Sequence, residues 1–275
     1  MESQYIDLLH HILRHGRERE TRNGIVKSMF GATLECDLAD GFPLLTTKKM
    51  FWRGIVEELS WFLRGSTNVQ ELRDKKVHIW DGNSATRNYD AGPVYGFQWR
   101  HFNANYSDCN TDYSNKGIDQ LKYIIKELKN PETRNSRRLI LSAWNPCQLH
   151  LMALPPCHVM CQFNVLNNKL SCSLYQRSGD VGLGVPFNIA SYSLLTHLIA
   201  HHTGLEAYDF VYFLGNAHIY DDHVEKLKIQ KDTIPQEFPK LKISKKYKNI
   251  QDYTVNDFII ENYNYASQIN LLMRQ

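Results

Sequence analysis

The sequence lacks three patterns that would place the protein in a membrane or outside the cell. Its six cysteines are scattered over 275 residues, with no CxxC pair and no dense framework, which indicates reduced thiols rather than disulfides. The segment Met1–Gln4 shows no apolar run after basic residues, so we expect no signal peptide. No apolar stretch approaches the roughly 18 residues needed to cross a bilayer. These absences predict a cytoplasmic protein with no membrane partner.

The chain also has little net charge and no run of basic residues. A formal charge of +3 is too small to indicate nucleic acid as the primary partner, although it suits a small anionic substrate if the arginines converge. We find no internal repeat, low-complexity tract or linker. With 43% hydrophobic residues, the chain is expected to form one domain spanning residues 1–275.

Hydrophobic spacing predicts helices and strands mixed along the chain. Apolar residues at helical spacing predict helices over residues 5–13, 55–63, 118–128, 187–203 and 220–230. Strand patterns cover residues 24–38, 139–144, 159–166, 169–175 and 211–214. This mixture predicts an α+β fold.

The strongest candidate for covalent chemistry is Cys157, which follows two prolines and precedes His158. A thiol attacks as its thiolate, and an adjacent imidazole or a nearby guanidinium would raise the ionised fraction. The predicted strands 159–166 and 169–175 are separated by a two-asparagine turn, which would bring Arg177 close to Cys157 in an antiparallel hairpin. The alternative is a buried cysteine that acts as a small hydrophobe.

Four arginines are candidates for binding a phosphate group. Arg22 lies in an early turn, Arg137 and Arg138 precede a predicted strand, and Arg177 follows another. The guanidinium fork matches phosphate oxygens, although a single arginine is usually a solvated surface residue.

Carboxylate and amide side chains suggest proton transfer and base recognition. Glu57 and Glu58 sit in a strongly apolar helix, and a carboxyl group on its apolar face would have a raised pKa suited to proton transfer. Asp180 lies among glycines and could be a turn residue or could bind a ring nitrogen of a ligand. Asn188 could cap the predicted helix, or its amide could pair with the O4 and N3–H edge of uracil.

The histidines offer a weaker signal. His197 and His201 are four residues apart on a predicted helix, but Leu198 replaces the glutamate of a zinc-hydrolase motif. We therefore interpret the pair as core or surface histidines and expect no metal.

Seven segments, taken together and in order, resemble the thymidylate synthase family, folate-dependent enzymes that methylate deoxyuridylate (dUMP). The resemblance runs from about residue 3 to about residue 263. The segments are Asp40–Lys48, Glu58–Leu63, Gly92–Gly96, Ala153–His158, Leu174–Asp180, Gly184–Ser191 and Ala217–Tyr220.

The resemblance implies transfer and reduction of a one-carbon unit from 5,10-methylenetetrahydrofolate to C5 of dUMP, giving dTMP and dihydrofolate without a metal. It also implies a bulged mixed β-sheet packed against helices, with the sheets of a homodimer back to back. Cys157 would add to C6 of the ring, Tyr95 would assist removal of the C5 proton, and Glu58 with His158 would manage protons.

The family roles transfer to three groups of residues. The implied catalytic residues are Cys157, Glu58, Tyr95, His158, Asn188 and Arg177. The implied nucleotide-binding residues are Arg22, Arg137, Arg138, Arg177, Ser178, Asp180, Asn188, His218 and Tyr220, with Arg137 and Arg138 supplied by the second subunit. The implied folate-binding residues are Lys48, Ile79, Trp80, Asp180, Leu183 and Phe187.

Some positions depart from the family pattern and keep alternatives open. Asn23 follows Arg22 where threonine is usual, Asn216 stands where aspartate is usual, and the tail after Asn262 is unusually polar. In the family this tail covers the folate, so the changes bear on closure of the pocket. The alternatives are a dUMP hydroxymethylase and a catalytically silent relative that binds nucleotide or RNA. A deoxycytidylate hydroxymethylase is disfavoured because that variant carries a carboxylate in place of Asn188.

Overall fold

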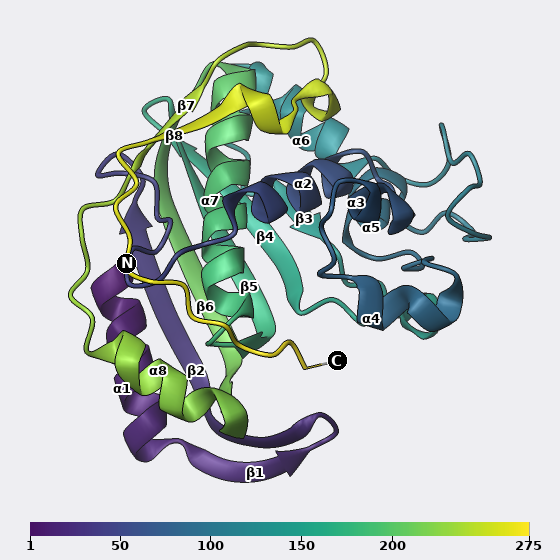
Figure 1. Ribbon diagram of the computed structural model, residues 1–275. Coiled ribbons are helices and arrows are strands. Elements are labelled where there is room, and N and C mark those ends of the chain that lie inside the picture. Colours follow the sequence, from purple (N-terminus) through teal and green to yellow (C-terminus); the bar gives the residue numbers. More distant parts are fainter. Residues whose placement is uncertain (275) are drawn as a thin grey trace.

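A six-stranded mixed sheet forms the centre of the computed structural model, which describes residues 1–274 (Figure 1). The strand order is β1-β2-β6-β5-β4-β3, and only β5 and β6 run parallel. The register shifts between His158 and Met160 and again between Leu170 and Cys172, so the sheet is bulged. The strands are β1 (Arg17–Thr21), β2 (Gly24–Asp37), β3 (Ile140–Ser142), β4 (His158–Leu166), β5 (Lys169–Asp180) and β6 (Glu206–Tyr220). This confirms the predicted α+β class with a bulged mixed sheet.

Eight α-helices within residues 1–274 surround the sheet (Figure 1). They are α1 (Glu2–His15), α2 (Trp52–Leu63), α3 (Gln70–Asp74), α4 (Asp81–Ser84), α5 (Tyr95–His101), α6 (Gln120–Lys129), α7 (Gly184–Thr203) and α8 (Val224–Lys231). Residues 1–274 also contain five short 3₁₀ turns: η1 (Ala85–Arg87), η2 (Leu149–Leu151), η3 (Asp221–His223), η4 (Ile250–Asp252) and η5 (Val255–Asp257). A separate two-stranded sheet pairs β7 (Lys240–Ile243) with β8 (Phe258–Glu261).

Helix α7 lies across one face of the sheet and is the main core helix (Figure 1). It packs against β5 and β6 on one side and against α2 on the other, so it is apolar nearly all round. It ends at Gly204, whose φ of +79° is the left-handed conformation that favours glycine. The helix begins at Gly184, so the N-cap interpretation of Asn188 is wrong: this side chain is buried in the second turn.

Two strands are longer than their sequence patterns predict. Strand β5 continues to Asp180, and β6 spans Glu206–Tyr220 rather than residues 211–214. Polar residues interrupt the apolar pattern of β6, but hydrogen bonding to β2 and β5 on both sides keeps it extended. Consequently the helix expected over residues 220–230 begins only at Val224.

The helix expected over residues 118–128 also begins two residues later, at Gln120. Asp119 caps it, because its carboxylate accepts a hydrogen bond of 2.8 Å from the backbone N–H of Lys122.

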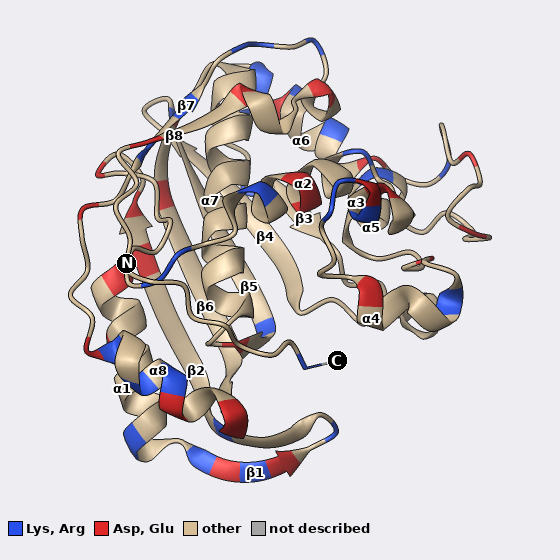
Figure 2. Cartoon of the chain, viewed as in Figure 1, with Lys and Arg blue, Asp and Glu red and all other residues tan. Residues whose placement is uncertain are grey.

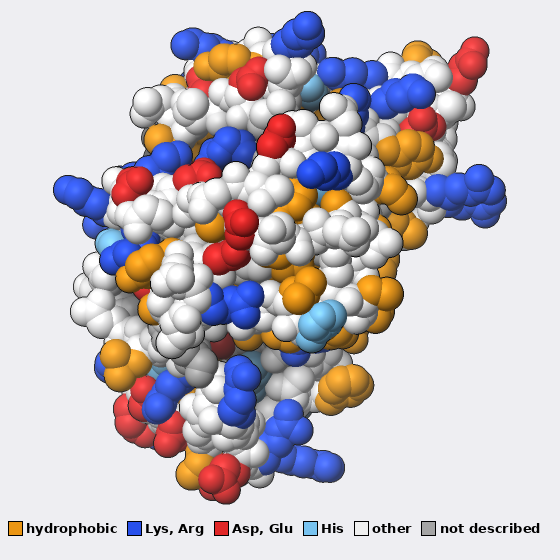
Figure 3. Space-filling view, turned by 90° about the vertical axis from the view of Figure 1, so that its right-hand side faces the viewer, with side chains coloured by type: hydrophobic (Ala, Val, Ile, Leu, Met, Phe, Trp, Pro, Cys, Tyr) orange, Lys and Arg blue, Asp and Glu red, His pale blue; other side chains and the backbone are white. Residues whose placement is uncertain are grey.

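Charged residues lie mainly on the elements around the periphery, and the strands β4 and β6 carry few of them (Figure 2). On the face shown in Figure 3, basic and acidic side chains are scattered around a central group of hydrophobic ones. None of the helices within residues 1–274 combines the length and apolar character needed to span a bilayer.

Candidate active site

The β4–β5 hairpin brings Cys157 and Arg177 together, as predicted. Cys157 immediately precedes β4, and its carbonyl accepts a hydrogen bond of 2.9 Å from the backbone N–H of Arg177. The guanidinium donates to the carbonyl oxygens of Pro155 and Pro156, both at 2.8 Å, and its Nη2 lies 3.8 Å from Cys157 Sγ. The guanidinium therefore fixes the loop that presents the thiol and also faces the sulfur.

The charge environment of the thiol differs from the prediction in two respects: the pKa of Cys157 is raised rather than lowered, and His158 carries no charge. Burial raises the pKa of Cys157, and the charge of Arg177 opposes that effect only in part. The adjacent imidazole does not help, because burial lowers the pKa of His158 to about 3 and keeps this ring neutral. Of the two groups expected to ionise the thiol, only Arg177 acts in that direction.

His158 instead belongs to a cluster of aromatic side chains with Tyr95 and Tyr192. Its ring lies 3.9 Å from that of Tyr95 at an interplanar angle of 18°, and its Nδ1 is 2.7 Å from the hydroxyl of Tyr192. The hydroxyl of Tyr95 accepts a hydrogen bond of 2.8 Å from the backbone N–H of Cys157. The cluster thus holds the backbone at the cysteine.

Glu58 is the carboxyl group that burial makes suitable for proton transfer. It projects from α2 into the same pocket, and Trp80 Nε1–H donates a hydrogen bond of 2.7 Å to its Oε1. Burial raises the pKa of Glu58 to about 7, although the bond from Trp80 opposes this. Near neutral pH this group can therefore both accept and release a proton.

Replacing Glu58 with glutamine should make stability less dependent on pH. The folded chain binds the Glu58 proton more tightly than the unfolded chain, so this group's stabilising contribution is complete below pH 4.5 and is lost as pH rises to about 7. A glutamine keeps the acceptor for Trp80 and does not titrate. We expect Glu58→Gln to gain about 2.5 kcal/mol in free energy of unfolding relative to wild type between pH 5 and pH 8.

Urea titrations of both proteins at each pH measure this difference. Glu57→Gln is the matched control, since Glu57 lies on the same helix but pairs with Lys75 at 2.6 Å. A stability difference between Glu58→Gln and wild type that stays constant from pH 5 to pH 8 would contradict the prediction.

The pocket around Cys157 has a volume of about 510 Å³ and collects most of the expected residues. The expected residues on its wall are Arg22, Glu58, Ile79, Trp80, Tyr95, Cys157, His158, Arg177, Ser178, Asp180, Leu183, Phe187, Asn188, His218 and Tyr220. These residues are spread over the sequence from residue 22 to residue 220, and the fold brings them to one cavity.

One end of the pocket is polar and cationic. A second hollow of about 310 Å³ adjoins it and shares Arg22, Arg177 and Ser178 with it. His218 lies on the wall between them, with its Nδ1 3.0 Å from Oδ1 of Asn216. Two guanidinium groups and a hydroxyl at one end suit a phosphate group.

The other end of the pocket has an apolar wall. Ile79, Trp80, Leu183 and Phe187 form it, which suits a flat aromatic ligand. Asp180 lies at its edge, where Oδ1 accepts from the backbone N–H of Gly182 at 2.8 Å. These contacts agree with the interpretation of Asp180 as a residue that holds a turn, and its place on the pocket wall keeps ligand binding as a prediction.

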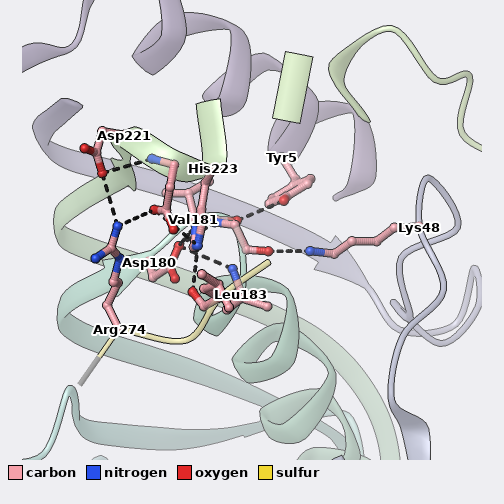
Figure 4. Close-up of polar contacts among 11 residues, drawn as sticks. Tyr5, Lys48, Asp180, Val181, Leu183, Asp221, His223 and Arg274 are labelled. Atoms are coloured by element: carbon pink, nitrogen blue, oxygen red, sulfur yellow. Dashed lines mark hydrogen bonds and ion pairs between the residues drawn. The ribbon is translucent and has the colours of Figure 1, made fainter. Parts of the chain in front are cut away.

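Three expected site residues lie outside this pocket. Lys48 is buried, and its Nζ donates to the carbonyl of Gly182 on the far side of the 181–183 turn (Figure 4). Burial lowers its pKa to about 8, against the opposing charge of Asp180. Arg137 and Arg138 are exposed just before the edge strand β3.

Several pocket residues were missed by sequence reasoning. Gln176 alternates with Ser178 and Asp180 along β5, and this two-residue spacing was the available signal. Arg274 and its tail neighbours also reach the pocket, but nothing local in the sequence indicates where an irregular tail docks. Behind the pocket wall, the hydroxyl of Tyr192 on α7 contacts His158, a contact that depends on the tertiary structure and leaves no local signal in the sequence.

The histidine pair on α7 does not face this pocket. His197 lies beside the ring of Phe42, and His201 Nε2 is 2.8 Å from the carbonyl of Lys245. Within residues 1–274, no three His, Cys, Asp or Glu side chains are grouped closely enough to hold a metal ion.

Comparison with known proteins agrees with this arrangement. The profile of the family "Thymidylate synthase" matches residues 3–274. The human (Homo sapiens) thymidylate synthase is 53% identical over 285 residues, covering 99% of this chain and 90% of the human protein. The thymidylate synthase of equine herpesvirus 2 (strain 86/87) is 51% identical, covering 99% of this chain and 98% of the viral protein. That of varicella-zoster virus (strain Dumas) is 50% identical over 96% of this chain and 91% of its own length. The chain belongs to the thymidylate synthase family.

Proposed function

We propose that this protein converts dUMP and 5,10-methylenetetrahydrofolate into dTMP and dihydrofolate. Similarity to thymidylate synthases over nearly the whole chain supports this activity and does not favour the hydroxymethylase or the silent relative. The observation that carries the proposal is the thiol of Cys157, held 3.8 Å from the Arg177 guanidinium in a pocket with one cationic and one apolar end.

In this proposal the Cys157 thiolate forms a bond to C6 of the uracil ring. The electron pair of the C5–C6 double bond moves toward C5 and O4, which makes C5 a nucleophile. Asn188, buried on the pocket wall, would pair with O4 and N3–H and stabilise the charge at O4. Glu58, with its pKa of about 7, would exchange protons with O4 and with the folate.

The remaining steps return the cysteine to its starting state. C5 bonds to the methylene carbon of the folate as the bond from that carbon to N10 breaks. Loss of the C5 proton, assisted by Tyr95, then breaks the bond to N5 and releases tetrahydrofolate, leaving an exocyclic methylene group on C5. A hydride from tetrahydrofolate then reduces the methylene group on C5, and the C6–S bond breaks to expel the thiolate. The hydride comes from the folate, so dihydrofolate accumulates with dTMP.

We assign substrate binding by the chemistry of the two ends of the pocket. Arg22, Arg177 and Ser178 would bind the phosphate, while His218 and Tyr220 would bind the sugar. The pterin would pack on the apolar wall of Ile79, Trp80, Leu183 and Phe187, oriented by Asp180. Lys48 would favour the glutamate tail by its charge, and direct contact would require its Nζ to leave the Gly182 carbonyl.

We also propose a cytoplasmic homodimer in which Arg137 and Arg138 reach the partner's phosphate site. Support comes from the sheet face opposite α7, where Ile140, Tyr175 and Phe213 are 41–43% exposed. An apolar sheet face of this kind suits packing against a second copy. Both arginines are exposed beside this face, and all six cysteines are free.

Two inactive variants should restore activity when mixed. In a mixed dimer of Cys157→Ser with an Arg137→Ala/Arg138→Ala double variant, one site combines an intact cysteine with intact arginines from the partner. Random subunit exchange should therefore give about a quarter of the wild-type activity. Activity of the mixture is measured after mild denaturation and refolding together, and a mixture as inactive as its components would contradict the shared site.

A product assay tests the proposed function as a whole. The protein is mixed with dUMP and methylenetetrahydrofolate, dihydrofolate is followed by absorbance, and the nucleotide is identified by mass. We expect dTMP and dihydrofolate in equal amounts. Hydroxymethyl-dUMP with tetrahydrofolate, or no product and no covalent adduct with 5-fluoro-dUMP, would overturn the proposal.

A further inference from the structure

The tail after β8 is fastened at its end, although it forms no helix or strand. Residues 262–274 cross the molecule in front of α7 and reach the pocket (Figure 1). Leu271, Met273 and Arg274 line the pocket wall. The departures from the family pattern therefore lie where the tail meets the site.

Two ion pairs hold the end of the tail. Arg274 Nη2 lies 3.0 Å from Oδ1 of Asp222 and 3.5 Å from Oδ1 of Asp221 (Figure 4). Both aspartates belong to η3, directly after β6, so they are attached to the sheet. One guanidinium facing two carboxylates is a small network, which stabilises more than an isolated surface pair.

A histidine next to this network holds the preceding part of the tail. His223 Nε2 is 2.7 Å from the carbonyl of Leu272 and 3.9 Å from Asp222. Its Nδ1 lies 3.7 Å from Asp180, at the edge of the apolar wall. Burial lowers the pKa of His223, but the nearby negative charge of Asp180 and the contact with the Leu272 carbonyl outweigh burial and raise it. The ring thus links the tail to the pocket edge.

These contacts place apolar tail residues against the folate side of the pocket. The Cδ1 atom of Leu271 would lie 3.0 Å from a Cβ added to Gly182, so the leucine packs directly on the 181–183 turn. Arg274 lies 5.9 Å from the ring centroid of Tyr220, on the nucleotide side. The tail end therefore spans both halves of the pocket.

We propose that Arg274 is a positioning residue that, through Asp221 and Asp222, latches the tail over the folate half of the pocket. Although Arg274 makes the tail more polar than is usual in the family, it does not loosen the tail. Its ion pairs attach the tail in place of apolar packing. The latch keeps Leu271 on the folate wall and limits entry of water to the methylene group on C5. This inference rests on the proposed function for its effect on folate.

The latch makes a prediction that does not depend on catalysis. In the ligand-free protein, Arg274→Met should increase chymotrypsin cleavage of the tail, at Tyr265 and the residues near Leu271, by about threefold to tenfold. In wild type, added salt should increase cleavage, because salt screens an exposed ion pair. In Arg274→Met the salt effect should be absent.

Arg274→Met also tests the role of the latch in turnover. We expect the KM for methylenetetrahydrofolate to rise by about threefold to tenfold with a smaller change in kcat, and a larger share of hydroxymethyl-dUMP formed with water and released with tetrahydrofolate. The reversed pair Arg274→Asp with Asp222→Arg should recover most of both effects. Lys242→Met, which removes a remote ion pair with Glu261, is the matched control.

The outcomes separate the latch from the proposed function. If wild type produces dTMP and dihydrofolate while Arg274→Met matches it in cleavage, KM and product, the latch is wrong and the function stands. Failure of the reversed pair to recover would also overturn the latch, provided that its dUMP affinity is normal. If wild type makes no dTMP, the function fails, and the cleavage rates alone decide whether Arg274 holds the tail.

Discussion

The Cys157→Ser variant should lose turnover by about four orders of magnitude or more while it still binds dUMP. A serine hydroxyl in the same place is a far weaker nucleophile than a thiolate at neutral pH, and the side chain recorded in contact with this position is the Arg177 guanidinium, which cannot accept a proton. Burial lowers the pKa of His158 to about 3, so its ring is too weak a base to take the proton of a serine hydroxyl, and its Nδ1 already contacts the hydroxyl of Tyr192. The loss should therefore appear in kcat, with the Kd for dUMP within a few fold of wild type.

Two measurements check the role of the sulfur. Turnover is followed by dihydrofolate absorbance, and mass spectrometry detects the adduct with 5-fluoro-dUMP in the presence of folate. The exposed Cys147→Ser is the matched control and should form the adduct normally. Residual turnover within tenfold of wild type, or an adduct in Cys157→Ser, would show that the reaction does not pass through this sulfur.

The local part of the fold followed from the sequence because short-range patterns determine it. The 3.6-residue spacing that predicts α1 and α2, and the two-asparagine turn between β4 and β5, act over neighbouring residues only. The lengths of β5 and β6 could not be predicted in this way. Their polar ends are held extended by strands distant in the sequence, and no local pattern records that pairing.

The same distinction between local patterns and long-range contacts applies to the candidate site. The approach of Arg177 to Cys157 followed from the hairpin, and the raised pKa of Glu58 followed from its apolar helix. The neutral state of His158 did not follow, because it depends on burial by residues of other elements. The attachment of Arg274 likewise depends on aspartates about fifty positions away in the chain.

Arg177→Met should lower kcat/KM for dUMP by about a hundredfold to a thousandfold, because one side chain performs three tasks. It locks the loop through two proline carbonyls, faces the thiol at 3.8 Å and lines the cationic end of the pocket. Removing one partner of a hydrogen-bonded charge pair costs about 2–5 kcal/mol, which covers this range. The pKa of Cys157, already raised by burial, should rise further without the opposing charge.

The pH dependence of thiol alkylation separates these tasks. The pH at which Cys157 reacts with iodoacetamide at half its maximal rate should be higher in Arg177→Met than in wild type, because a smaller fraction of the thiol is ionised at each pH. Arg177→Lys keeps a positive charge but not the fork that spans both carbonyls, so its alkylation profile should move less while its KM for dUMP still rises. Arg64→Met, which removes a remote ion pair with Glu71, should leave both unchanged. If the alkylation profile of Arg177→Met is unchanged, the guanidinium does not stabilise the thiolate and acts only on the loop and the phosphate. The thiolate would then have to be stabilised by the bound nucleotide rather than by the free protein.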